Sequence, residues 1–290
     1  MGVLSSVMGY QYCDKTCLLY LSMLNEHIVL ILGLVGVCVA SFLNVVAYRL
    51  PRMMENDWRR EAQEFLGLPM EEKLKLSLTL PKSHCPACKA PIAWYRNIPI
   101  LSWLLQRGRC HHCAAKIPTR YVVVELLGLL SGVMAGVMFG HTLYALVVLG
   151  FCLMSLALAV IDAETGLLPD VLVYPFLWTG LALNSIGLLV SPKEAIWGAM
   201  AGYLFMWVPA KIFSLLRKTD GMGHGDFKYL AALGAWLGAA SLPIVVVLAS
   251  VYTLLHALLR YYFAKDDIKK PHAFGPGLAL AGVLFMLMVF

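Results

Sequence analysis

Four cysteines stand in two pairs, Cys85-x2-Cys88 and Cys110-x2-Cys113, with 21 residues between the pairs. Two residues between cysteines let one tight turn direct both sulfurs at a single ion, and a second such turn completes a tetrahedron. A segment this short cannot build its own hydrophobic core, so a metal would supply its folding energy, roughly 10 kcal/mol or more. The spacing therefore predicts a structural zinc site with four thiolate ligands.

Two alternatives to this zinc site stay open at the level of the sequence. The four cysteines could form two disulfides, although basic flanking residues favour a reducing cytoplasmic location. One of the neighbouring histidines, His84, His111 or His112, could also replace a thiolate in a Cys3His site. Cys13 and Cys17, near the N-terminus, could form a disulfide or remain as two thiols.

Two aspartates, Asp162 and Asp226, interrupt an otherwise apolar half of the chain. An aspartate in mid-membrane costs roughly 3 kcal/mol, so such residues usually face a protein interior or a wet cavity. Asp162 directly follows the apolar run SLALAVI, and Asp226 follows the glycine-rich stretch GMGHG. Gly223 and Gly225 in that stretch would let another backbone approach closely. We expect both aspartates at the same membrane depth, on the cytoplasmic side.

Two carboxyl groups at one depth permit acid–base chemistry without a metal. If they approach within a few ångströms, both cannot ionise readily and one keeps its proton. The two groups can then act as general base and general acid on a water molecule that attacks a peptide carbonyl. The same residues would also suit a proton-coupled transporter, so the residues alone leave both functions open.

Other polar residues near these aspartates receive more ordinary interpretations. Asp170 follows Pro169 and is expected to cap the next helix. Asp220 is interpreted as a solvated loop residue and His224 as a loop histidine, although His224 could tune the acidity of the carboxyl groups. Lys228 either holds negative charge near the site or marks the cytoplasmic edge of a span.

The elements that must position these residues are membrane helices. The chain has 290 residues, of which 60% are hydrophobic and 14% charged, and its mean hydropathy is +0.75. Apolar runs of about 20 residues, enough to cross roughly 30 Å of hydrocarbon, recur along it. We predict an all-α polytopic membrane protein with about eight transmembrane helices, the first retained rather than removed as a signal peptide. The predicted spans lie near 28–48, 121–140, 143–161, 171–190, 195–216, 228–241, 243–262 and 275–290.

Basic residues predict the orientation of these helices. Thirteen Lys or Arg fall within residues 49–120, whereas the loops near His141, Lys193 and Ser241 carry almost none. The positive-inside rule therefore places residues 49–120 in the cytoplasm and both termini outside. The net charge of +6 is a topology signal and an attraction to anionic lipid, and it does not call for a nucleic-acid partner.

The chain divides into three parts on this reading. Residues 1–48 hold the N-terminal segment and the first span, 49–120 the cytoplasmic module, and 121–290 the helical domain with both aspartates. Within the module, residues 52–77 are expected to form short amphipathic helices on the membrane surface, with a break at 67–69.

Several long motifs in this order resemble the type IV prepilin peptidases, membrane aspartyl proteases of the Gly-x-Gly-Asp kind. They are SFLNVVAYRLP, the cysteine segment from CPACKAPIAWYRN onward, IDAETGLLPDVLVYPFLWTGL, GMGHGDFKYLAALGAWLG and FGPGLALAG. The resemblance covers nearly the whole chain and implies that Asp162 and Asp226 are the catalytic residues. Gly223, Gly225 and Lys228 would then belong to the loop that the substrate approaches.

The resemblance also implies a substrate, a location and a second reaction. Family members cleave a short basic leader after a glycine from prepilins and from the pseudopilins of type II secretion, at the cytoplasmic face of the bacterial inner membrane. Many also methylate the new N-terminus with S-adenosylmethionine. This chain lacks a glycine-rich nucleotide motif. No motif therefore locates the methyl donor. Shorter relatives without the zinc segment tend to be peptidases only, so the resemblance implies a donor site near that segment, and the candidate binding residues are Asn44, Arg49, Gly108, Arg120 and Glu125.

Three rival functions give different expectations. A proton-coupled transporter would use the same aspartates for solute flux, and a membrane scaffold would use the zinc module to dock a partner. A narrower alternative is a peptidase that does not methylate. The sequence does not predict an oligomeric state.

Overall fold

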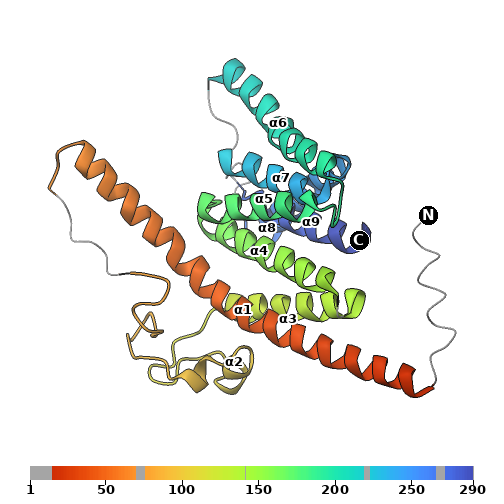
Figure 1. Ribbon diagram of the computed structural model, residues 1–290. Coiled ribbons are helices and arrows are strands. Elements are labelled where there is room, and N and C mark those ends of the chain that lie inside the picture. Colours follow the sequence, from red (N-terminus) through yellow and green to blue (C-terminus); the bar gives the residue numbers. More distant parts are fainter. Residues whose placement is uncertain (1–14, 70–75, 141, 219–222, 266–271, 290) are drawn as a thin grey trace.

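The computed structural model describes residues 15–69, 76–140, 142–218, 223–265 and 272–289. These residues form helices joined by loops. In Figure 1, the segment with the four cysteines, residues 85–113, lies on one side of a helical bundle. Two short 3-10 turns, Trp94–Asn97 and Ala239–Ser241, complete the secondary structure. The helices are α1 Lys15–Phe65, α2 Leu101–Leu105, α3 Arg120–Phe139, α4 Leu143–Thr165, α5 Asp170–Ser185, α6 Pro192–Arg217, α7 His224–Leu237, α8 Leu242–Ala264 and α9 Gly275–Val289.

Each of the eight predicted apolar stretches coincides with a helix. Five described segments are long and apolar enough to cross a membrane, and they belong to α1, α3, α4, α6 and α8. The helices α5, α7 and α9 have 16, 14 and 15 residues and are shorter than a simple span requires. The all-helical membrane fold is therefore confirmed, whereas a full crossing by these three short helices stays a prediction.

The first helix is longer than expected. Residues 52–65 were expected to form separate surface helices, but α1 continues without interruption through Pro51 to Phe65. The segment after the proline is rich in Met, Glu, Arg, Ala and Gln, all strong helix formers, which outweigh the one backbone hydrogen bond that a proline removes. Gly67 has φ of +64° just beyond the helix end, so the predicted break at 67–69 is confirmed.

Small residues let the membrane helices approach closely. Gly128, Gly132 and Gly136 recur every four residues along α3 and face α1. A Cβ atom built on Gly132 would lie 2.1 Å from the carbonyl oxygen of Leu32, so any larger residue would separate the helices. Close packing at glycines also joins α6 to α7, where a Cβ on Gly198 would lie 2.1 Å from the carbonyl oxygen of Gly234.

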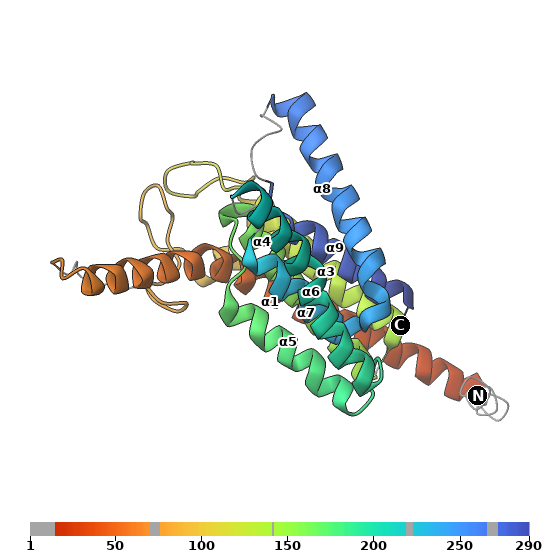
Figure 2. The same ribbon diagram turned by 90° about the horizontal axis from the view of Figure 1, so that it is seen from above.

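Helix α7 is the core of the C-terminal half. It packs against α5 and α6 and also contacts α8 and α9. Figure 1 shows α7 between α6 and α5, and Figure 2 shows α5 along one edge of the bundle. Its Tyr229 and Trp236 belong to a buried aromatic cluster with Phe151 of α4 and Phe176 of α5. The Trp236 indole nitrogen donates a hydrogen bond to the Phe176 carbonyl, at 2.8 Å. This packing fixes the N-terminal end of α7 beside the C-terminal end of α4.

Candidate active site and metal centre

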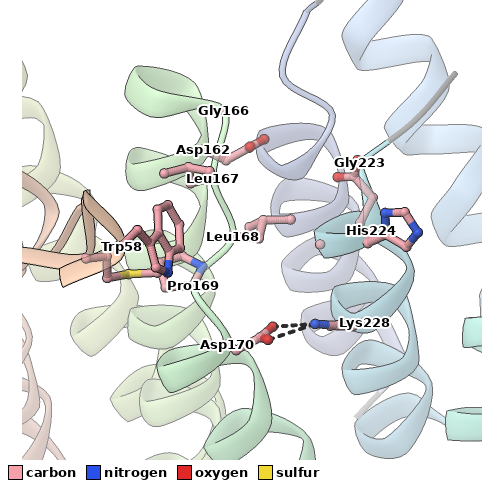
Figure 3. Close-up of a pocket in the computed structure, with 13 residues that line it drawn as sticks. Trp58, Asp162, Gly166, Leu167, Leu168, Pro169, Asp170, Gly223, His224 and Lys228 are labelled. Atoms are coloured by element: carbon pink, nitrogen blue, oxygen red, sulfur yellow. Dashed lines mark hydrogen bonds and ion pairs between the residues drawn. The ribbon is translucent and has the colours of Figure 1, made fainter. Parts of the chain in front are cut away.

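A cavity of about 370 Å³ opens where four helices meet. Its walls come from the C-terminal end of α4, the loop at residues 166–169, the first turns of α5 and α7, and the far part of α1 (Figure 3). The lining residues are Met54, Trp58, Asp162, Gly166, Leu167, Leu168, Pro169, Asp170, Gly223, His224, Gly225, Asp226 and Lys228. Both predicted catalytic aspartates therefore line one cavity, together with all three residues of the predicted approach loop.

Asp162 is held in a fixed position in the last turn of α4. Its side chain is buried, and its Oδ2 atom accepts a hydrogen bond of 2.8 Å from the backbone N–H of Gly275, the first residue of α9. A Cβ atom on Gly275 would lie only 2.6 Å from the same oxygen, so a larger residue would push the carboxyl group aside. Gly275 thus positions Asp162 and leaves its other oxygen for further contacts.

Asp226 reaches the cavity from the first turn of α7, where backbone N–H groups favour negative charge. It is half-buried and close enough to Asp162 for the two carboxyl groups to interact electrostatically. Gly225 packs against Leu168, because a Cβ on Gly225 would lie 2.8 Å from the Leu168 Cβ. The glycine-rich approach therefore brings α7 close to the loop after α4, and Gly221 lies outside the described residues.

Asp170 does not cap α5 as expected. Pro169 is the residue at the cap position, and Asp170 lies in the first turn. The Lys228 Nζ atom donates to both carboxylate oxygens of Asp170, at 2.8 Å each, and this ion pair crosses the floor of the cavity in Figure 3. The pair joins the first turn of α5 to the first turn of α7. Lys228 therefore holds negative charge next to the predicted catalytic residues, one of the two roles considered for it. Asp220 lies outside the described residues.

Two cavity residues were missed by the sequence analysis. Met54 and Trp58 line the cavity from α1, one helical turn apart. Their spacing on one helix face was visible in the sequence, but it indicated a helix on the membrane surface. Only a helix that continues straight past Pro51 reaches this place.

The four cysteines form a cluster that could hold a metal ion. The Sγ atoms of Cys85, Cys88, Cys110 and Cys113 all lie within 4.8 Å of one another, and the four residues are free thiols. The Cys85 and Cys113 sulfurs are 3.9 Å apart. Zinc–sulfur bonds of about 2.3 Å in a tetrahedron place the sulfurs about 3.8 Å apart, so the cluster fits that ion. The prediction that these four cysteines come together is confirmed, and the alternative of two disulfides is not what the structure contains.

Each cysteine pair lies on the same kind of tight turn. In the first, the Cys85 N–H donates to the Ala90 carbonyl at 2.9 Å, and in the second, the Cys110 N–H donates to the Ala115 carbonyl at 2.8 Å. Hydrogen bonds from the backbone N–H groups of Cys113 and His112 lower the pKa of the Cys110 thiol to about 6. A thiolate is the form that binds metal, so the turn prepares Cys110 as a ligand.

The five residues predicted to bind the methyl donor lie around the metal-binding segment, but most of their polar groups are engaged within the chain. The Arg49 guanidinium donates to the Ser77 carbonyl at 2.8 Å and the Pro81 carbonyl at 2.6 Å. Arg120 forms an ion pair with Glu164, two residues after Asp162. Gly108 has φ of +65° and packs against the Trp103 ring, so it serves the turn before the second cysteine pair.

Glu125 and Asn44 lie at the seam between α1 and α3. The Glu125 carboxylate accepts hydrogen bonds from two groups of the chain. Its Oε1 accepts from the Ser41 hydroxyl and its Oε2 from the Ile100 N–H, both at 2.7 Å. Asn44 donates to the Tyr121 carbonyl at 3.1 Å, and its buried Oδ1 atom has no partner within the described residues. Among the five residues predicted to bind the methyl donor, Asn44 is therefore the one with a buried acceptor atom, Oδ1, that has no partner within the described residues.

Comparison with known proteins extends over both halves of the chain. Residues 34–139 match the bacterial peptidase A24 N-terminal domain, and residues 149–258 match the type IV leader peptidase family. No solved structure matches this chain.

The curated relatives of this chain include proteins named prepilin leader peptidase/N-methyltransferase. The one from Stutzerimonas stutzeri is 46% identical, with 87% of this chain and 88% of the relative covered. The one from Dickeya chrysanthemi is 44% identical (89% and 92% covered), and the one from Pseudomonas aeruginosa is also 44% identical (88% and 88%). Identity at this level over nearly all of both chains means that the chain belongs to the type IV leader peptidase family.

Proposed function

We propose that this protein cleaves the short basic leader from prepilins and pseudopilins after a glycine, and then methylates the new N-terminus. Membership of the family and the name that its curated relatives carry support both reactions. The single observation that carries the first reaction is the cavity lined by both Asp162 and Asp226.

The two carboxyl groups would divide the work of peptide hydrolysis. The ionised carboxylate takes a proton from water as the oxygen attacks the carbonyl carbon of the scissile bond. The protonated carboxyl gives its proton to the leaving nitrogen when the C–N bond breaks, which releases the leader acid and a free amine. The hydrogen bond from Gly275 would keep Asp162 in the orientation that this transfer needs.

The metal would serve the fold of the module rather than hydrolysis. We propose zinc, since four thiolates within 4.8 Å fill a tetrahedral shell and leave no position for water. The module would then span residues 49–120, with residues 1–48 before it and the peptidase domain at 121–290 after it.

S-adenosylmethionine would supply the methyl group in the second reaction. We propose that the seam between α1 and α3 holds it, because the buried Asn44 Oδ1 is an acceptor without a partner in the part of the chain that the structure describes. The nearby Glu125 carboxylate also suits a cationic ligand. Arg49, Gly108 and Arg120 would shape this region through the contacts described above.

Location follows from the basic segments. We propose a bacterial inner-membrane protein with the cysteine cluster and the cavity on the cytoplasmic side. The apolar helix of a prepilin could then lie among the spans, in contact with lipid, while its basic leader stays in the cytoplasm.

The test uses the full-length protein in detergent and a prepilin-like peptide with a basic leader, and product masses are read with and without S-adenosylmethionine. Asp162→Asn and Asp226→Asn should each abolish cleavage, whereas Asp57→Asn, an exposed aspartate on α1, should not. The mature fragment should gain one methyl group only with the donor present. Cleavage by either aspartate variant would overturn the catalytic assignment. Proton-coupled solute flux in vesicles without cleavage would favour the transporter, and cleavage without methylation would leave a peptidase alone.

A further inference from the structure

The cavity has an apolar side that the hydrolytic chemistry does not use. Met54 and Trp58 line it from α1, and Leu167 and Leu168 line it from the loop after α4. Trp58 keeps 48% of its surface exposed, and Met54 and the two leucines are only half-buried. This apolar surface therefore remains open beside the two carboxyl groups.

One pair of charged residues in the cavity is already neutralised. Asp170 and Lys228 form an ion pair with each other, so neither presents a free charge to a ligand. Figure 3 shows this pair between the helices, with Trp58 on the opposite side of the 166–169 loop from His224. A peptide in the cavity would thus meet the ion pair between Asp170 and Lys228 on one side and the open apolar side chains on the other.

The apolar side is not a general property of this part of α1. The far end of the helix has an exposed polar face, on which Arg59 and Glu55 form an ion pair of 3.3 Å. Residues four apart share a helix face, so Met54 and Trp58 form one stripe and Glu55 and Arg59 form the neighbouring one. The stripe that carries large apolar side chains is the one that faces the cavity.

We propose that Met54 and Trp58 form a subsite for an apolar side chain of the substrate, within the first three residues after the cleaved bond. This inference rests on the proposed function, in which the cleaved bond stands at the start of a hydrophobic helix. Removing an apolar side chain from water against an indole ring and a thioether is favourable, and methionine adapts to different shapes. The subsite would make cleavage depend on the hydrophobic segment as well as on the leader.

The test is a double-mutant cycle between enzyme and peptide. Wild type and Trp58→Ala are each assayed on four peptides, one with leucine at the first three positions after the cleaved bond and three with alanine at one of them. Trp58→Ala should lower kcat/KM about tenfold on the all-leucine peptide. The loss should be much smaller on one of the three alanine peptides, the one in which alanine replaces the leucine that occupies the subsite. Trp58→Phe should restore most of the loss, because it keeps an aromatic ring at this place.

Phe65→Ala is the matched control, since Phe65 is an aromatic residue of the same helix with 90% of its surface exposed. It should leave all four values of kcat/KM unchanged. An equal loss on all four peptides, or no loss, would overturn the subsite, because a wall that only supports the fold cannot distinguish leucine from alanine. A wild-type protein that cleaves none of the peptides would overturn the proposed function, and the subsite with it.

Discussion

Replacing Gly275 by alanine should abolish most of the catalytic activity, although neither predicted catalytic aspartate is mutated. The new Cβ atom would lie 2.6 Å from the Asp162 Oδ2 atom and 3.0 Å from its Cγ atom. Ordinary contacts begin at about 3.4 Å, so the carboxyl group or the start of α9 has to move by about 0.8 Å. A misplacement of this size in a reacting group can cost roughly 100-fold in rate. We therefore expect Gly275→Ala to lower kcat for leader cleavage by about two orders of magnitude, with a smaller change in KM.

Gly277→Ala provides the matched control for this prediction. Gly277 lies on the same helix, and a Cβ atom there would come within 2.7 Å of the Ala249 carbonyl oxygen on α8, away from Asp162. Overpacking of this kind typically costs about 1–3 kcal/mol of stability. Both variants should therefore melt at a lower temperature than wild type, but only Gly275→Ala should lose catalysis in its folded fraction. If folded Gly275→Ala cleaves within threefold of wild type, or if Gly277→Ala loses as much, Gly275 does not act by positioning Asp162.

Three further predictions concern the surroundings of the site. Removing the metal with a chelator should unfold the cysteine turns, so cleavage by an added protease within residues 85–113 should increase, and added zinc should reverse this increase. An unchanged digestion pattern would argue against a structural metal. Glu125→Leu removes the acceptor of both the Ile100 N–H and the Ser41 hydroxyl, so it should lower the free energy of unfolding by about 1–3 kcal/mol in a thermal melt, whereas an unchanged melt would mean that these bonds are dispensable. Asp170→Lys and Lys228→Asp should each lower the rate of leader cleavage, and the double variant, which restores an ion pair with its charges exchanged, should recover it. Equal activity in the two single variants and the double variant would show that the ion pair does not shape the cavity.

The parts of the site that depend on local spacing could be predicted from the sequence. Two residues between cysteines determine a tight turn wherever it occurs, which is why the cysteine cluster was found. Asp162 and Asp226 each stand where an apolar run meets a polar segment, so membrane physics predicts a common depth for them, and both line one cavity.

The parts that the sequence did not predict depend on contacts between distant segments. Gly275 is 113 residues from Asp162, and no local pattern links a glycine in FGPG to a carboxylate in another helix. The ion pair between Asp170 and Lys228 joins residues 58 apart and depends on α5 and α7 beginning side by side. The contribution of Trp58 depends on α1 staying helical beyond Pro51, where a proline ordinarily suggests a break.

The length of α1 connects the cysteine module to the cavity mechanically. Ser41 joins the helix to Glu125, Arg49 holds the loop before the first cysteine pair, and Trp58 lines the cavity. At 1.5 Å per residue, the distance from Ser41 to Trp58 along the axis is about 26 Å. Arg49 donates to carbonyl oxygens of the module and Glu125 accepts from the backbone N–H of Ile100, so both helices hold its main chain. Loss of the metal, which changes the course of the main chain, should therefore disturb α1 and reach the cavity, whereas side-chain substitutions on the module surface should not.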